Sequence, residues 1–340
     1  MTDPPPAPAA ATASAGDLLH ARVCDLGLRI EDSPLEPVLR RFREELAARR
    51  LGFRPPIYLS DEWGCPDEVP IIAIPFYHAD PRLRQIEQER TGALESDDDI
   101  LRTLRHETGH AFNYAYRLWE GPEWKRLFGD FRAVYRERYT VRPFDDRFVR
   151  VLPGWYAQKH PDEDFAETFA AWLDPETDWR ERYAGWRAHE KLEYVDRMVA
   201  ELADAPPVVP PAPPIHPVEE MDVTVEAYYR SRSETLPLPT ATFFDDELRA
   251  IFEAPDGSGD GRARAADWMA REEDRVVGAV MAHTGEWTPF VGRLWTWLRR
   301  RAGTLDLRVD PDEASAALVD LTALVTAAVT HERWRDATAS

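Results

Sequence analysis

The chain has 340 residues, enough for two domains of ordinary size, and 44% of them are hydrophobic, which excludes disorder of the whole chain. Acidic residues outnumber basic residues by 62 to 42, so the formal net charge is −20. Because this charge repels phosphate groups and anionic lipid heads, we expect neither nucleic-acid binding nor membrane binding.

The cysteines and the first residues bear on the cellular location. Cys24 and Cys65 are too few for a disulfide framework or a four-thiolate zinc site, and they leave a single disulfide open. Residues 1–16 contain prolines and no Lys or Arg, so they predict a disordered tail and do not have the pattern of a secretory signal. No stretch approaches the roughly 18 apolar residues that span a bilayer. We therefore expect a cytoplasmic protein with reduced thiols.

Residues 17–204 are expected to form one domain that begins with a helix and two strands. Apolar residues at helical spacing predict the helix over 35–49. Two short apolar runs, at 57–59 and 71–77, predict the strands. Pro75 cannot donate a hydrogen bond to a sheet, which favours an edge position for the second strand.

The rest of this domain is predicted to be helical, which makes its fold class α+β. Ser96 and the three aspartates after it are typical of a helix start, because they satisfy the positive end of a helix. The helical pattern then continues over 100–119. Further helices are predicted over 123–138, 162–173 and 178–202.

A composition break follows at residues 205–217, which read APPVVPPAPPIHP and contain seven prolines. Such a segment is extended and semi-rigid, so we expect a linker and a domain boundary there. Residues 218–340 are expected to form a small all-α domain of unknown role that could bind a partner protein. Its predicted helices lie at 244–252, 263–283, 289–302 and 311–334.

The pattern HExxH occurs within the helix predicted over 100–119, where residues 105–110 read RHETGH. His106 and His110 are one turn apart on one helix face, so their imidazoles can converge on one metal ion. Glu107 is offset by about 100° around the helix. That offset lets its carboxylate take a proton from a water molecule without becoming a ligand. The pattern predicts a Zn²⁺ site.

A catalytic zinc needs three protein ligands and an open position for water. Tyr116 stands where the extended HExxHxxGxxH motif would have its third histidine, which excludes that motif. The segment HPDEDFAETFAAWL, which starts at His160, can instead supply a carboxylate from a second helix. Glu163 and Glu167 project together there, so that one can bind zinc while the other hydrogen-bonds a ligand imidazole. For His160 we favour a structural role such as capping, with substrate contact and metal ligation as alternatives.

These two motifs carry a resemblance to known proteins. HETGH followed by HPDEDFAETFA resembles a bacterial family of zinc-binding metallopeptidases of the gluzincin type. The pairing of HExxH with ExFAE is also similar to the catalytic domain of anthrax lethal factor. The resemblance spans roughly residues 20–200 and implies a zincin-like metallopeptidase domain. In that architecture, the strand at 71–77 would pair with the extended backbone of a substrate.

The resemblance also implies roles for particular residues. Glu163 corresponds to the third zinc ligand and Glu167 to an outer-shell residue that supports the ligands. Tyr156, seven residues before Glu163, corresponds to a tyrosine that stabilises the transition state. Chemistry supports this role, because a phenol can donate a hydrogen bond to the carbonyl oxygen on which charge develops.

The sequence thus predicts a zinc metallopeptidase that acts on a peptide or protein substrate, with Glu107 as general base. One alternative is a processing protease for a single partner peptide, recognised through residues 218–340. Another is a zinc-stabilised protein-binding module without turnover. Glu107 and Tyr156 together favour the enzyme, because a structural zinc site needs neither and normally has a fourth protein ligand.

Overall fold

The computed structural model describes residues 15–91, 94–136, 139–233, 243–254, 262–284 and 288–338. The chain divides into two compact units. Unit 1 comprises residues 1–90 and 94–231, and unit 2 comprises residues 91–93 and 232–340. The tail predicted for residues 1–16 lies outside the described residues, apart from its last two, where the first helix begins.

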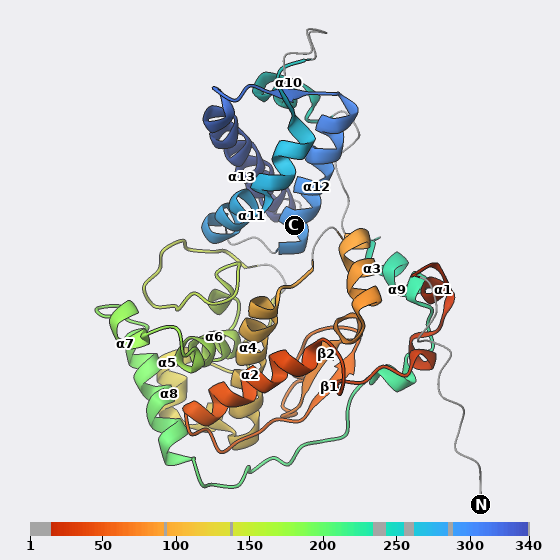
Figure 1. Cartoon of the computed structure of the whole chain (residues 1–340). Helices are drawn as coiled ribbons and strands as arrows, with labels where there is room; N and C mark the ends of the chain where they lie inside the picture. Colours follow the sequence, from red (N-terminus) through yellow and green to blue (C-terminus); the bar gives the residue numbers. More distant parts are fainter. Residues whose placement is uncertain are drawn as a thin grey trace, which may run out of the picture. The chain divides into compact units, whose positions relative to one another are not determined.

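Unit 1 combines many helices with one small parallel sheet, in agreement with the predicted α+β class (Figure 1). Its 3₁₀ helices are η2 (Val23–Leu26), η3 (Phe76–Ala79), η4 (Leu118–Glu120), η5 (Tyr156–Gln158) and η6 (Val218–Glu220). Its α-helices and strands are, in chain order, α1 (Ala15–His20), α2 (Leu35–Ala48), β1 (Ile57–Ser60), β2 (Ile72–Pro75), α3 (Pro81–Thr91), α4 (Asp97–Tyr116), α5 (Pro122–Phe128), α6 (Pro161–Leu173), α7 (Trp179–Arg182), α8 (His189–Glu201) and α9 (Val225–Ser233).

Helix α4 is central to unit 1, because it packs against α2, β2 and α6, while α6 in turn packs against α5 and α8 (Figure 1). A buried ion pair joins α2 to α4. The Arg105 guanidinium donates to both carboxylate oxygens of Glu45, at 2.7 and 2.8 Å, and lies 3.2 Å from a carboxylate oxygen of Asp174. Such a two-pronged contact fixes geometry as well as distance. The residue directly before His106 is therefore anchored.

The two strands lie where the sequence predicts them, and β2 is an edge strand of its two-stranded sheet, although an isolated bridge to Gly64 covers part of its other side. β1 and β2 pair in parallel, with Pro75 as the last residue of β2, where its missing amide hydrogen disturbs the ladder least. On the other side of β2, Ala73 and Gly64 exchange hydrogen bonds of 2.8 and 3.4 Å. The chain itself therefore pairs with this side of β2 at Ala73. Pairing of a substrate with this strand stays a prediction.

Two predicted helices end early or divide at glycines. The helix predicted over 123–138 is α5, which ends at Phe128 because Gly129 has a φ of +113°. The helix predicted over 178–202 divides into α7 and α8 around Gly185, which has a φ of +78°. Positive φ values break a right-handed helix, and glycine adopts them at little cost. The described residues between α5 and η5 therefore form turns and coil.

The predicted linker at residues 205–217 runs along unit 1. The amides of Val208 and Val209 donate to the carbonyl oxygen of Ala115 at the end of α4, at 2.8 and 3.0 Å. The Ser60 hydroxyl donates to the carbonyl oxygen of His216 at 2.8 Å. Prolines keep this segment extended, and these polar groups of its backbone bind the surface of unit 1.

The chain after this segment completes unit 1 instead of starting unit 2. Arg22 forms an antiparallel bridge with Thr224, and the amide of Val23 donates to the carbonyl oxygen of Val223 at 2.9 Å. Four side chains from this stretch are buried in the core of unit 1, namely Val218, Val225, Tyr228 and Tyr229. The division at Ser231 thus differs from the boundary predicted at 205–217.

Unit 2 has its own hydrophobic core, formed mainly by its helices. The expected all-α composition is incomplete, because two short strands form an antiparallel pair. Among the described residues, no helix of either unit is both long enough and apolar enough to span a membrane. Cys24 and Cys65 are free thiols. The elements of unit 2 are α10 (Asp245–Ile251), β3 (Ala263–Arg264), α11 (Ala265–Thr284), α12 (Thr288–Thr304), β4 (Arg308–Val309) and α13 (Ala314–Thr338).

The division at Ser231 leads to a prediction about truncated chains. A chain that ends after α9, at Ser233, should unfold cooperatively, because the core of unit 1 is complete. A chain that ends at Asp204 should be far less stable, since it lacks four buried side chains that each stabilise by about 1.5–3 kcal/mol. Thermal unfolding followed by circular dichroism compares the two chains. Equal melting temperatures would instead support a boundary at 205–217.

Candidate metal centre

Helix α4 starts at the predicted residue, and its start sets the position of the HExxH residues. The Ser96 hydroxyl accepts from the amide of Asp99 at 3.2 Å, and the Asp99 carboxylate accepts from the amide of Ser96 at 3.1 Å. This reciprocal cap satisfies two amide groups that have no partner within the helix. From His106 to Tyr116 every side chain of α4 is buried, so both histidines lie inside unit 1.

Helix α6 starts at His160, whose side chain is the N-cap. Its Nδ1 accepts from the amide of Asp162 at 3.2 Å, and its Nε2 lies 3.0 Å from the carbonyl oxygen of Ala133. A neutral imidazole with its proton on Nε2 makes both bonds. Pro161 occupies the first helical position, where its missing amide hydrogen costs nothing. The structure therefore gives His160 a capping contact, and among the described residues it has no contact with the HExxH histidines.

The two helices approach each other very closely at Gly109. A Cβ atom added there would lie 2.7 Å from the Cα of Ala166 and 3.0 Å from its carbonyl oxygen. It would also lie 3.0 Å from the Cβ of Phe169. Real side chains do not tolerate such distances to backbone atoms, so only glycine fits. Gly109, the second x of HExxH, is thus the residue that lets α6 pack closely against α4.

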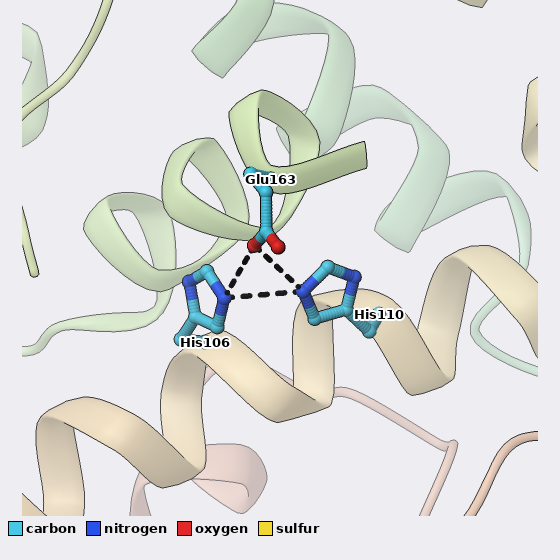
Figure 2. A group of neighbouring side chains, drawn as sticks. All are labelled: His106, His110 and Glu163. Carbon is cyan, nitrogen blue, oxygen red and sulfur yellow. Dashed lines mark hydrogen bonds and ion pairs between the residues drawn. The ribbon is translucent and has the colours of Figure 1, made fainter. Parts of the chain in front are cut away.

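This packing brings Glu163 of α6 to His106 and His110 of α4, as Figure 2 shows. Oε2 of Glu163 lies 3.1 Å from the Nε2 atoms of both histidines, and these two nitrogen atoms are 3.1 Å apart. All three side chains are buried. Two imidazole nitrogens and a carboxylate oxygen that face one point could together hold a metal ion, and this donor set suits Zn²⁺.

The other ring nitrogens of the two histidines each contact a second carboxylate. Nδ1 of His106 lies 3.0 Å from Oε1 of Glu167, and Nδ1 of His110 lies 2.8 Å from Oδ2 of Asp162. The Glu167 carboxylate also accepts the amides of Val151 and Leu152, both at 3.0 Å. Carboxylates in these positions direct the other ring nitrogen toward the point where the three side chains meet, and they increase its basicity.

Asp162 is a site residue that sequence reasoning missed, because an acidic residue in the first turn suggests only a helix start. Its carboxylate accepts the Tyr114 hydroxyl at 2.5 Å and the side-chain amide of Asn113 at 2.8 Å, besides contacting His110. The sequence does contain one signal for this contact. His110, Asn113 and Tyr114 have i, i+3 and i+4 spacing, which places three polar side chains on one helix face.

The charges of the residues around His106 and His110 indicate whether a cation fits this site. Four buried carboxylates, those of Glu107, Asp162, Glu163 and Glu167, surround the two imidazoles. Burial alone would lower the pKa of His106, but its hydrogen bonds to Glu163 and Glu167 raise the pKa to about 9. Burial acts in the same way on His110, and the charges of Asp162 and Glu163 outweigh it, so its pKa is well above the usual range. A divalent cation would compensate this buried negative charge, so the residues fit a metal ion.

Glu107 is on the same helix and is almost entirely buried, with 8% of its surface exposed. Burial raises the pKa of its carboxyl group, and the two histidines oppose this rise. Among the described residues, no hydrogen bond holds its carboxylate. The group is therefore available to a water molecule or a substrate.

Tyr156 lies beside His106, with the two ring centroids 5.6 Å apart. Its hydroxyl is 3.5 Å from the Tyr135 hydroxyl and 3.5 Å from Nζ of Lys159. Tyr135 also donates a hydrogen bond to Oε1 of Glu163. Sequence reasoning missed Tyr135, because this residue lies in the stretch predicted as a continuation of α5 and has no spacing relation to either motif.

The region that contains the cluster of His106, His110 and Glu163 also matches a known protein family. Residues 68–196 match the family model described as "Putative zinc-binding metallo-peptidase". The matched region contains α4, α6 and all three side chains of the cluster, and it covers less than half of the chain. No curated protein and no solved structure matches the chain. The similarity to anthrax lethal factor therefore remains a resemblance of motifs.

Substitution of Gly109 tests the contact between the helices. Gly109→Ala should destabilise the protein by about 1–3 kcal/mol, because the new methyl group would overlap the backbone of α6. It should also weaken zinc binding, since α6 carries Glu163. The matched control is Gly278→Ala in α11, where an added Cβ meets no atom within 4 Å and alanine should stabilise the helix by about 0.5–1 kcal/mol. Denaturant unfolding and zinc titration measure both effects, and equal behaviour of the two variants would contradict the tight contact.

Metal analysis tests the donor set itself. The protein should bind about one zinc ion per chain, and His106→Ala, His110→Ala and Glu163→Ala should each abolish binding, because each removes one of three donors. Asp162→Asn should weaken zinc binding by about 10- to 100-fold, since it acts through His110. His160→Ala is the control and should retain zinc. If His160→Ala lost zinc while Glu163→Ala kept it, the third donor would be wrongly assigned.

Proposed function

We propose that the protein is a zinc-dependent metallopeptidase that hydrolyses peptide bonds, with unit 1 as a zincin-like catalytic domain. The observation that carries this proposal is the convergence of His106, His110 and Glu163 beside the buried carboxylate of Glu107. The match of residues 68–196 to the family model described as "Putative zinc-binding metallo-peptidase" also supports it. Peptide or protein substrates are the expected substrate class.

The zinc ligands in this proposal are His106, His110 and Glu163, with Glu167 and Asp162 holding the two imidazoles in orientation. Zinc held by these residues would supply an activated water with a pKa of about 7 and would polarise the substrate carbonyl group. Three protein donors leave room for that water, whereas a purely structural site normally has four.

Glu107 moves the proton in this proposal. Its carboxylate takes a proton from the attacking water as the new C–O bond forms at the peptide carbonyl carbon. It then gives that proton to the peptide nitrogen as the C–N bond breaks, so the products are a carboxylate and an amine.

In this proposal, Tyr156 acts on the carbonyl oxygen of the peptide bond that is cleaved. Negative charge develops on the carbonyl oxygen during attack, and a phenol at the edge of the buried cluster can donate a hydrogen bond to it. The ring contact with His106 supports this role, because it keeps the phenol next to a zinc ligand. The ammonium group of Lys159 lies near the same hydroxyl and adds a favourable charge.

Steady-state kinetics with a diverse peptide pool test this mechanism. Glu107→Gln should bind zinc normally and lose about 10²- to 10⁴-fold in kcat, because the amide keeps the shape of the side chain and removes the base. Tyr156→Phe should keep zinc and lose about 10²- to 10³-fold in kcat, with a smaller change in KM. Rates are compared at equal zinc occupancy.

The same kinetics separate the enzyme from a binding module. A zinc-loaded wild-type protein that cleaves no peptide in the pool, and whose Glu107→Gln variant binds peptides equally well, would favour the module. Wild-type turnover by Glu107→Gln would rule out Glu107 as the base. Zinc loss in Tyr156→Phe would mean that this tyrosine supports the site structurally.

A further inference from the structure

The two carboxylate oxygens of Glu163 have different partners. Oε2 lies 3.1 Å from the Nε2 atoms of both His106 and His110. Oε1 instead accepts a hydrogen bond from the hydroxyl of Tyr135. Oε2 is thus directed at the two imidazoles, while Oε1 is hydrogen-bonded to Tyr135, a residue outside both sequence motifs.

Tyr135 is held in this position through its ring as well as its hydroxyl. Nζ of Lys159 lies 4.4 Å from the ring centroid, within the range of a cation–π contact. The imidazole of His160 lies 5.3 Å away, centroid to centroid. Both residues directly precede α6, the helix that carries Glu163. The phenol is therefore fixed relative to the carboxylate that it contacts, although 46% of the tyrosine is exposed.

The hydrogen bond to Oε1 limits what Glu163 can do for a metal ion. A carboxylate can coordinate through one oxygen or through both, and the second mode uses an additional coordination position. Hydrogen bonds to a charged carboxylate are strong. The bond from Tyr135 engages one of the two lone pairs of Oε1 and holds the donor close to this oxygen, so coordination of a metal ion through Oε1 would compete with it. A catalytic zinc must keep a position for water, so a carboxylate restricted to one oxygen suits it.

We propose that Tyr135 is a positioning residue that restricts Glu163 to coordination through Oε2 and thereby leaves a coordination position for water. The inference rests on the proposed function, because it assumes a metal ion among His106, His110 and Glu163. It adds a residue of the coil between α5 and η5 to the site. Tyr135 acts through Glu163 and is assigned no contact with substrate.

Cobalt substitution tests this role without a measurement of activity. Co²⁺ occupies sites of this donor type, and its visible absorption bands are stronger with four ligands than with five. The full-length wild type, Tyr135→Phe and Tyr139→Phe are titrated with Co²⁺ and compared by spectrum and affinity. Tyr139 is the matched control, because its hydroxyl donates to the carbonyl oxygen of Gly154 at 2.6 Å in the same coil. The control thus loses one phenol hydroxyl without removing a contact of Glu163.

We expect Tyr135→Phe to lose intensity in the visible bands and to bind Co²⁺ about tenfold more weakly, as for other residues that orient a ligand. Tyr139→Phe should match the wild type in both respects. A wild-type spectrum and affinity in Tyr135→Phe would overturn the proposal. So would a complete loss of Co²⁺ binding, because Tyr135 would then be a ligand itself.

The wild-type protein distinguishes this inference from the proposed function. If the wild type binds Co²⁺ and Tyr135→Phe changes the spectrum, but zinc-loaded wild type cleaves no peptide, the peptidase function fails while the role of Tyr135 stands. If the wild type cleaves peptides and Tyr135→Phe leaves the spectrum unchanged, only the role of Tyr135 fails. A wild type that binds no Co²⁺ and no zinc would overturn both.

Discussion

At Gly109 the backbone of α4 comes so near to that of α6 that no side chain fits between them. His106 lies three residues before this point on α4, and Glu163 lies three residues before Ala166 on α6. Residues three positions apart lie on the same helix face, so both side chains flank the contact. The approach of the backbones therefore sets the distance between the imidazole and the carboxylate.

Three consecutive acidic residues fix the rotation of α6 about its own axis. Asp162 contacts His110, Glu163 faces both histidines, and the Asp164 carboxylate accepts the Lys191 ammonium group of α8 at 2.5 Å. Consecutive residues point about 100° apart, so these contacts hold the helix against α4 through Asp162 and Glu163 and against α8 through Asp164. The positive end of the helix also stabilises carboxylates in its first turn. Acidic residues that would suit any helix start thus serve here to orient a site.

The sequence predicted what depends on local spacing. The helix start at Ser96 and the helix from Pro161 follow from periodicity and capping, and the structure has both. The choice of Glu163 over Glu167 as the third donor came from the resemblance of the two motifs to a known family, and the structure places Glu163 beside the two histidines. The sequence did not predict the hydrogen bond from Tyr135 to Glu163, because a contact made by a coil residue depends on where the chain folds back. The observed division at Ser231 differs from the boundary predicted at 205–217 for a related reason. Prolines indicate an extended segment, but only tertiary contacts decide whether that segment separates two units or lies along one of them.

The bridge between Arg22 and Thr224 has a further consequence for the architecture of unit 1. The stretches that open and close this unit are hydrogen-bonded to each other, so the chain enters and leaves the unit at nearly the same place. Domains with adjacent ends tolerate circular permutation and insertion into other proteins. Unit 1 could therefore be inserted into a host protein at a single surface loop. Additional domains could also be joined at this point without changing the order of the helices that form the candidate metal centre.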